Sequence, residues 1–185
     1  MKIFLGRIFR SIASRLDLMR SKIAALIIKL KYPSIQIKSG VYIGKRCEII
    51  SNNTGCIILE GTHINHSVTI IASENATIKI GRSSIGRNSL IAARESIQIG
   101  NDCSIAEFVV IRDQNHVHSL SPTLIENQGY EVAPITIGDN VWIGTKTTVL
   151  KGVSIGENSI LGAHSLANKS IPPSSKYAGT PAKPI

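Results

Sequence analysis

The chain is poor in aromatic residues. Phe, Trp and Tyr make up 4% of its 185 residues, whereas hydrophobic residues make up 43%. A core with so few aromatic side chains has to be filled by Ile, Val, Leu and Ala. This suits thin, repeated layers of β-branched side chains better than a globular sandwich with aromatic anchors.

Cysteine is also scarce, with three residues: Cys47, Cys56 and Cys103. An odd number without paired spacing argues against a disulfide framework, and no Cys/His spacing typical of a zinc site is present. We therefore expect the cysteines to be small, mostly buried side chains in a reducing compartment, and we predict no metal site.

Long apolar runs are missing near the N-terminus. The longest charge-free run after residue 22 extends only from Ile23 to Ile28, with cations on both sides. A secretory signal or a membrane span needs a longer run, so the sequence predicts a cytoplasmic protein.

The net charge of +9 is concentrated in one segment, because residues 1–31 carry eight Lys or Arg and one Asp. The remainder is nearly neutral and offers few aromatic rings, so nucleic acid is not an expected partner. Apolar residues in the basic segment recur at spacings of three and four, which predicts an amphipathic helix ending before Pro33. They are Ile8, Ile12, Leu16, Met19, Ile23 and Leu26 or Ile27. This helical segment, residues 1–33, either contacts an anionic membrane at its inner face or caps the following domain or a neighbouring subunit.

After Pro33 the apolar residues recur every six positions. One series is Ile137, Ile143, Val149, Ile155, Leu161 and Ala167; a second, two residues earlier, includes Ile135, Val141, Thr147, Val153, Ser159, Ser165 and Ile171. Side chains two residues apart in a strand share a face, so both series point inward, and Gly, Asn and Asp suit the corners between strands. Three hexapeptides close one triangular coil. Residues 34–171 are thus predicted to form an all-β stack, with about four coils over 35–111 and two over 135–171.

One long segment interrupts the repeat. Residues 112–134 lack the six-residue period and are rich in polar residues and turn formers. A long excursion from a rigid scaffold is a typical place for functional residues. Residues 172–185 form a proline-rich tail that we expect to cap the last coil.

The repeat run, the extruded loop that leads into PITIGDNVWIG, and the tail IPPSSKYAGTPAKPI together resemble the hexapeptide acyltransferases. The branch that they resemble is that of the maltose and galactoside O-acetyltransferases, including enzymes that acetylate surface polysaccharides. The resemblance implies a left-handed parallel β-helix, a homotrimer with active sites between subunits, acetyl-CoA as co-substrate and a sugar acceptor.

The resemblance also implies roles for particular residues. His116 matches the catalytic histidine of the loop, and the acceptor-binding asparagine falls near Arg87 or Asn88. Positions matching those that contact coenzyme A are Thr145, Ala163, Asn168, Lys169 and Lys183. The loop continues VHSLSP, which departs from the pattern of the small-sugar enzymes.

The chemistry of acetyl transfer suits these residue types. An imidazole with an ordinary pKa near 6.5 is largely a free base at neutral pH, so His116 is our candidate general base, with His118 as its competitor. We place Asp113 with Asn88 and Trp142 among the expected substrate-binding residues, where it either orients the imidazole or caps the loop. The amide of Gly144 is a candidate oxyanion donor. Trp142 points outward, toward a neighbouring subunit, a sugar ring or an adenine.

Other functions fit the same pattern. An N-acetyltransferase of an amino sugar or a serine acetyltransferase would use nearly the same chemistry. A γ-type carbonic anhydrase shares the fold but needs three histidines on zinc, and His63, His66 and His164 lack the expected coil spacing. A non-catalytic scaffold is the remaining alternative. The basic helix and the long loop favour a capsule or lipopolysaccharide acceptor, or its precursor, over a free sugar.

Overall fold

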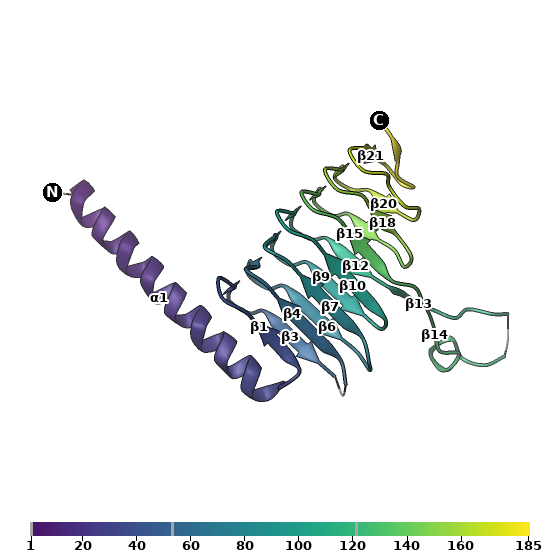
Figure 1. Cartoon of the computed structure of the whole chain (residues 1–185), viewed down its shortest axis with the longest axis horizontal. Helices are drawn as coiled ribbons and strands as arrows, with labels where there is room; N and C mark the ends of the chain where they lie inside the picture. Colours follow the sequence, from purple (N-terminus) through teal and green to yellow (C-terminus); the bar gives the residue numbers. More distant parts are fainter. Residues whose placement is uncertain (1, 53, 121) are drawn as a thin grey trace.

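The structure is a computed structural model that describes residues 2–52, 54–120 and 122–185, with side chains described from residue 12 onward. Helix α1 (Lys2–Lys31) comes first and leads into a three-sided stack of short strands. Figure 1 shows α1 extending beyond the first coil and one long loop leaving the side of the stack.

Three sheets form the sides of the stack, and each coil contributes one strand to each sheet. The first contains β1 (Ile35–Ile37), β4 (Cys56–Leu59), β7 (Thr77–Ile80), β10 (Ser96–Ile99), β15 (Ile135–Ile137) and β18 (Ser154–Ile155). The second contains β2 (Tyr42–Ile43), β5 (His63–Ile64), β8 (Ser84–Ile85), β11 (Ser104–Ile105), β16 (Trp142–Ile143), β19 (Ile160–Leu161), β21 (Lys176–Ala178) and β22 (Lys183–Pro184). The third contains β3 (Glu48–Ser51), β6 (Thr69–Ala72), β9 (Leu90–Ala93), β12 (Val110–Arg112), β17 (Thr148–Val149) and β20 (Leu166–Ala167).

The strands that stack along each sheet are parallel, and only β21 and β22 pair antiparallel within these three sheets. Four coils precede the loop and two follow it, as the six-residue period predicts. The predicted fold class, a left-handed parallel β-helix of hexapeptide repeats with an N-terminal helix and an extruded loop, is confirmed.

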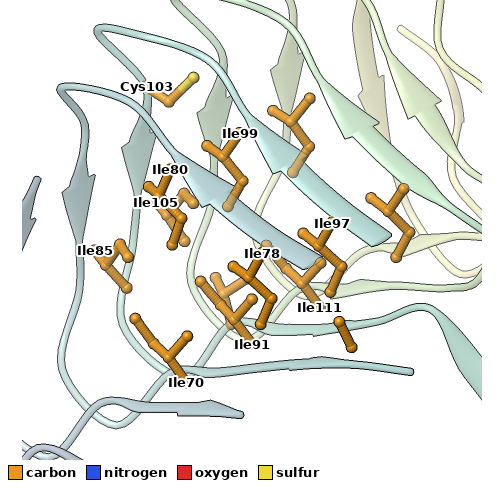
Figure 2. Packing of buried hydrophobic residues seen from close by; sticks show 14 of the residues in the cluster. Ile70, Ile78, Ile80, Ile85, Ile91, Ile97, Ile99, Cys103, Ile105 and Ile111 are labelled. Atoms are coloured by element: carbon orange, nitrogen blue, oxygen red, sulfur yellow. The ribbon is translucent and has the colours of Figure 1, made fainter. Parts of the chain in front are cut away.

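The core is a column of aliphatic side chains in layers. Ile97 pairs with Ile78 on one side and Ile135 on the other, so identical residues from successive coils stack along the axis. Figure 2 shows the neighbouring isoleucines pointing into the same interior. The small members of the inward series serve the corners instead, because the hydroxyl of Thr147 donates to the Gly162 carbonyl at 3.0 Å and that of Ser159 to the Pro172 carbonyl at 2.8 Å.

The early coils are longer than the late ones. Ile35 pairs with Ile57 and Ile57 with Ile78, steps of 22 and 21 residues, whereas Thr136 pairs with Ser154 after 18. The additional residues lie in wider corners, which explains why the six-residue period is loose between residues 50 and 78. In the regular coils, the corner residues Asn140 and Asn158 have φ angles of 53° and 58°, and their side-chain amides hydrogen bond at 2.9 Å.

Helix α1 caps the open end of the first coil. The guanidinium of Arg20 donates to the carbonyls of Ile43 and Gly44, and the buried Ser21 hydroxyl accepts the Ile43 N–H at 2.8 Å. Tyr42 donates its hydroxyl to Asp17. Capping was one of two predicted roles for the helix, but the predicted apolar stripe is not the capping surface: Ile12, Leu16, Met19, Ile23, Leu26 and Ile27 are all exposed.

In the part of the chain that the structure describes, no helix combines the length and the apolar character needed to cross a bilayer.

At the C-terminal end of the stack, β21 and β22 continue the second sheet, and Tyr177 and Ala182 of the tail pack against the core.

Candidate functional site

The extruded loop is built on a short antiparallel hairpin. Strand β13 (Gln114–His116) follows β12 directly and pairs with β14 (Tyr130–Val132), with a 3₁₀ turn η1 (Ile125–Asn127) between them. At its base, the Ala133 N–H donates to the Asp113 carbonyl at 2.9 Å. Figure 1 shows the hairpin standing away from the coils. The sequence indicates this segment only as a polar interruption of the repeat. In the structure, the hairpin holds the backbone at the base of the segment in a defined conformation.

His116 lies at the end of β13, opposite Tyr130, and its side chain is exposed. The two rings pack with centroids 4.3 Å apart and planes tilted by 41°. The Arg94 guanidinium carbon lies 3.5 Å from the centroid of the same Tyr130 ring, in a cation–π arrangement. Within the described residues, neither ring nitrogen of His116 has a hydrogen-bond partner, so the imidazole is held by packing while its nitrogens remain open.

His118, the predicted competitor, is exposed two residues further along the loop. Its Nδ1 lies 3.2 Å from the His116 carbonyl oxygen, so this ring is engaged with the loop backbone. The loop beyond it is organised by Gln128, whose Oε1 accepts from the Ser119 N–H and whose Nε2 donates to the Thr123 carbonyl. Within the described residues, both ring nitrogens of His116 are thus open, whereas the Nδ1 of His118 is engaged.

Asp113 is fully buried, and the structure favours the second of its two predicted roles. One carboxylate oxygen accepts the Arg94 N–H and the other accepts the Glu95 N–H, each at 2.8 Å. A carboxylate engaged in this way does not reach a ligand at the surface or orient the His116 ring. Its predicted place among the substrate-binding residues is therefore corrected: Asp113 anchors the base of the loop to the turn between β9 and β10.

A second part of the site is a hollow of about 340 Å³ at the corner between the second and third sheets. We call it the Trp142 hollow. It brings together four residues predicted for the site, Trp142, Gly144, Thr145 and Ala163, and adds Ala106, Glu107, Ile160, Leu161 and Gly162. Trp142 points outward, as predicted, and is 54% exposed. The lining is mostly apolar, which suits a ligand with an extended aliphatic or amide chain.

The role predicted for the Gly144 amide is wrong. Its N–H donates to the Leu161 carbonyl at 2.7 Å as part of the ladder, so it is not available to an oxyanion. Gly144 is needed for a steric reason instead, because a Cβ at this position would lie 2.4 Å from the Ala163 nitrogen. The neighbouring corner amides of Thr145 and Ala163 have no hydrogen-bond acceptor among the described residues. The Thr145 hydroxyl donates to the Glu107 carbonyl at 2.9 Å.

Asn88 lies one corner away along the same edge of the stack. It adopts a φ of 57° and is exposed in a hollow with Asn65, Gly86, Arg87, Glu107 and Phe108. Glu107 lines both this hollow and the Trp142 hollow. Asn88, predicted to bind the acceptor, therefore lies on one continuous edge with Thr145 and Ala163, two of the residues predicted to bind coenzyme A.

The remaining predicted cofactor residues lie elsewhere. Asn168 and Lys169 are exposed just after β20, and Lys183 is exposed in β22 at the C-terminal end of the stack. None of them lines the Trp142 hollow. Within one chain, the structure does not bring these residues together with the hollow or with His116.

One chain also keeps the imidazole apart from the hollow. The loop carrying His116 leaves between β12 of the third sheet and β15 of the first, whereas the Trp142 hollow lies between the second and third sheets. No loop residue lines the hollow. Each chain thus carries the His116 loop and the Trp142 hollow on different edges of the triangular stack.

Sequence reasoning missed Tyr130, Arg94, Glu107 and Phe108. The contact of Tyr130 with His116 depends on hairpin register across a long segment, which periodicity does not encode. Glu107 and Phe108 occupy corner positions of the six-residue repeat. The same spacing that identifies Thr145 and Ala163 as corner residues is the signal that could have identified them. Across the described ranges, no three His, Cys, Asp or Glu side chains gather closely enough to hold a metal ion.

The chain matches known proteins over much of its length. The family model described as bacterial transferase hexapeptide (six repeats) matches residues 134–168. The chain is 38% identical over 115 residues to galactoside O-acetyltransferase of Escherichia coli K12, covering 61% of this chain and 55% of that protein. The putative lipopolysaccharide biosynthesis O-acetyl transferase WbbJ of the same organism is 41% identical over 102 residues, 51% of this chain and 52% of that protein. The chain therefore carries the hexapeptide repeat and is similar to transferases of that family.

The chain spans about half the length of the curated relatives it matches. Among solved structures, AntD, an N-acyltransferase from Bacillus cereus in complex with a dTDP-amino sugar and coenzyme A, superposes with a TM-score of 0.71. That match covers 85% of this chain and 86% of AntD at 20% identity, and it supports the fold.

Proposed function

We propose that this protein transfers an acetyl group from acetyl-CoA to a sugar hydroxyl, with His116 as the general base. The observation that carries the proposal is the exposed His116 imidazole, packed on Tyr130 with both ring nitrogens open within the described structure. A base has to be held in place yet remain reachable by the proton it abstracts, and this arrangement meets both requirements. The two Escherichia coli O-acetyltransferase relatives support the same reaction class.

In the proposed reaction, the imidazole takes the proton of the acceptor hydroxyl as its oxygen attacks the thioester carbonyl. The carbon–sulfur bond then breaks, and the proton passes from the imidazolium to the departing coenzyme A thiolate. A positioned base of this kind contributes about 10²–10⁴-fold to the rate. The corner amides of Thr145 and Ala163 replace Gly144 as candidate donors to the oxyanion, because they line the hollow and their N–H groups are open.

The Trp142 hollow is our proposed seat for the pantetheine arm of acetyl-CoA. Its apolar lining suits the arm, and the exposed cations Lys169 and Lys183, with Asn168, suit the phosphates at the far end of a long ligand. Asn88, further along the same edge, is the proposed contact for the acceptor, and Trp142 is proposed to contact a substrate where it lines the hollow.

The complete site requires more than one copy of the chain. Since the His116 loop and the Trp142 hollow lie on different edges of a triangular stack, copies packed side by side around a common axis would bring the loop of one against the hollow of the next. We therefore propose a homotrimer with three sites between subunits. A mass of three chains in sedimentation velocity is the expected result, and a monomer with full activity would overturn it.

For the acceptor, we propose a cell-surface polysaccharide such as capsule or lipopolysaccharide, or its precursor. The exposed extruded loop offers room for a long acceptor, and the relative WbbJ carries lipopolysaccharide biosynthesis in its name. The three cysteines are free, which agrees with our placing the reaction in the reducing cytoplasm.

The test is release of free thiol from acetyl-CoA with free sugars, nucleotide sugars and bacterial polysaccharides as acceptors. His116→Ala is expected to lower kcat/KM by about 10²–10⁴-fold, because it removes the base. His118→Ala is the matched control and is expected to retain nearly normal turnover. Near-normal turnover in His116→Ala would reject the assignment.

The product distinguishes the proposed reaction from N-acetylation of an amino sugar or of serine. An O-acetyl ester is cleaved by mild base, whereas an amide survives it. Loss of the acetyl group after mild alkaline treatment supports transfer to oxygen, and survival of the group would redirect the proposal to an amine acceptor.

A further inference from the structure

The outward face of α1 carries an apolar stripe that the described chain leaves uncovered. Its residues recur at spacings of three and four, which puts them on one side of a helix. They are Ile12, Leu16, Met19, Ile23, Leu26, Ile27 and Leu30, and each is at least 49% exposed. A continuous exposed apolar surface on a folded protein is typical of a site that binds a protein partner or a membrane.

The stripe is separate from the face that docks α1 to the first coil. That docking face consists of Ser21, which accepts the Ile43 N–H, together with the partly buried Ala25 and Ile28. Ser21 and Ile23 are two residues apart, about 200° around a helix of 3.6 residues per turn. One therefore points into the protein and the other away from it. Capping the β-helix does not account for the stripe.

Cations border the stripe. Arg15, Lys22 and Lys29 follow one edge, and Lys31 lies beyond the other. Lys22 and Lys29 also line a hollow against Ser39 and Gly40, where the helix meets the first coil.

The single acidic residue between 12 and 31, Asp17, is on the docking side. It is held there by the Arg20 guanidinium at 2.9 Å and by the Tyr42 hydroxyl. The outward half of the helix therefore combines apolar side chains with positive charge alone.

We propose that this face docks the protein on a membrane surface rich in anionic lipid. The apolar stripe lies in the acyl boundary, and Arg15, Lys22 and Lys29 reach the phosphate level with their aliphatic stems along the stripe. Charge complementarity selects lipid over a second copy of the chain. Two α1 helices packed stripe to stripe would bring cationic rims together without acidic partners.

The docking contacts fix how the protein would sit on the membrane. Arg20 and Ser21 bind the backbone of Ile43 and Gly44, so the helix is attached to the first coil through hydrogen bonds on its inner face. The end of the stack that begins with β1 is therefore nearest the lipid, while the C-terminal end points away. This inference does not depend on the proposed transferase activity.

Sedimentation of the full chain with vesicles tests the proposal. Binding is expected to vesicles of phosphatidylcholine mixed with phosphatidylglycerol, and to weaken with added salt and with phosphatidylcholine alone. The double variant Leu16→Gln/Ile23→Gln is expected to lose about tenfold or more in apparent affinity, because two apolar side chains no longer enter the bilayer. Lys22→Gln and Lys29→Gln are each expected to cost about fivefold.

Leu18→Gln is the matched control, because Leu18 is 48% exposed on the same helix but lies outside the stripe, beyond the cationic row. It is expected to bind vesicles like the unmodified chain. Far-ultraviolet circular dichroism of each variant verifies that α1 remains helical, and thiol release measured without lipid is expected to be unchanged.

Equal binding by the stripe variant and the Leu18 variant would overturn the proposal, as would absence of binding to anionic vesicles. Sedimentation velocity without lipid tests the remaining candidate for covering the stripe, which is a second copy of the chain. If the stripe variant lowers the mass of the oligomer and the unmodified chain ignores vesicles, a second copy covers the stripe and the membrane proposal fails.

Discussion

The ring of Tyr130 packs on the imidazole of His116 with centroids 4.3 Å apart, across the hairpin that the two residues share. Arg94 lies on the same tyrosine ring, 3.5 Å from its centroid. The side chain proposed as the base is thus positioned by the ring of a neighbouring residue. Its orientation depends on the ring of Tyr130 rather than on a carboxylate partner.

Replacing Tyr130 should therefore impair turnover without abolishing it. Tyr130→Ala is expected to lower kcat by about tenfold, part of the factor that a positioned base supplies, with little change in KM for acetyl-CoA. Tyr130→Phe keeps the ring and should restore kcat. Steady-state kinetics of both variants would test this, and equal kcat values for Tyr130→Ala and the unmodified chain would contradict the positioning role.

The buried carboxylate of Asp113 should matter for stability. Asp113→Ala leaves the part-buried backbone N–H groups of Arg94 and Glu95 without their acceptor, and an unpaired donor costs about 1–3 kcal/mol when it is fully buried. The free energy of unfolding from urea titration is expected to fall by about that amount or more. Asp102→Ala is the matched control, since Asp102 forms an exposed ion pair with Arg82 that is worth about 0–1 kcal/mol. A similar loss in both variants would refute the anchoring role.

Most of the fold was predictable because one physical constraint repeats. Ile97, Ile78 and Ile135 occupy equivalent inward positions, so the six-residue period encodes strand, corner and stacking together. The longer early coils were harder to predict from the sequence. Extra residues in the corners between β3 and β4 and between β6 and β7 break the six-residue period, but the strands still stack in the same three sheets.

The site was predictable only in part, for reasons that differ by residue. Thr145 and Ala163 lie together because corners one coil apart are always adjacent. The Gly144 amide was misassigned because spacing places a residue at a corner but does not say whether its N–H belongs to the ladder. The contact of Tyr130 with His116 depends on the register of a hairpin whose turn is irregular, and no periodicity fixes that register.

Gly144 should tolerate no side chain. A Cβ there would lie 2.4 Å from the backbone nitrogen of Ala163, whereas the nearest atom to a Cβ at Gly162 would be the Ala178 Cβ, at 3.0 Å. Gly144→Ala forces adjacent coils apart and is expected to destabilise the fold by about 1–3 kcal/mol or more. Gly162→Ala is the graded comparison, with a smaller expected loss. Thermal unfolding of both variants measures the difference, and the reverse order would contradict close packing of the coils at Gly144.

The Cys103 thiol should be slow to react at neutral pH. Burial raises its pKa, and the side chain is 2% exposed with its sulfur 3.0 Å from the Gly138 carbonyl oxygen. Because the folded pKa is higher than the unfolded one, the associated stability is complete below the unfolded pKa and is lost as pH rises through the folded value. Modification by a thiol reagent should be slow in the native protein, faster toward alkaline pH and complete in urea. Cys103→Ser assigns the slow phase, and rapid native modification of Cys103 would contradict its burial.

The attachment of α1 to the first coil should depend on Ser21. Its hydroxyl is buried and accepts the Ile43 N–H at 2.8 Å, so Ser21→Ala leaves a buried donor unpaired at a cost of about 1–3 kcal/mol. Since the rest of the stack does not rely on this bond, the loss should appear first as release of the helix. Limited proteolysis is expected to cleave α1 faster in Ser21→Ala than in the unmodified chain. Ser39→Ala, which removes an exposed hydroxyl from the first coil, should be cleaved at the same rate as the unmodified chain. Equal cleavage of α1 in the two variants would mean that the Arg20 and Asp17 contacts hold the helix without Ser21.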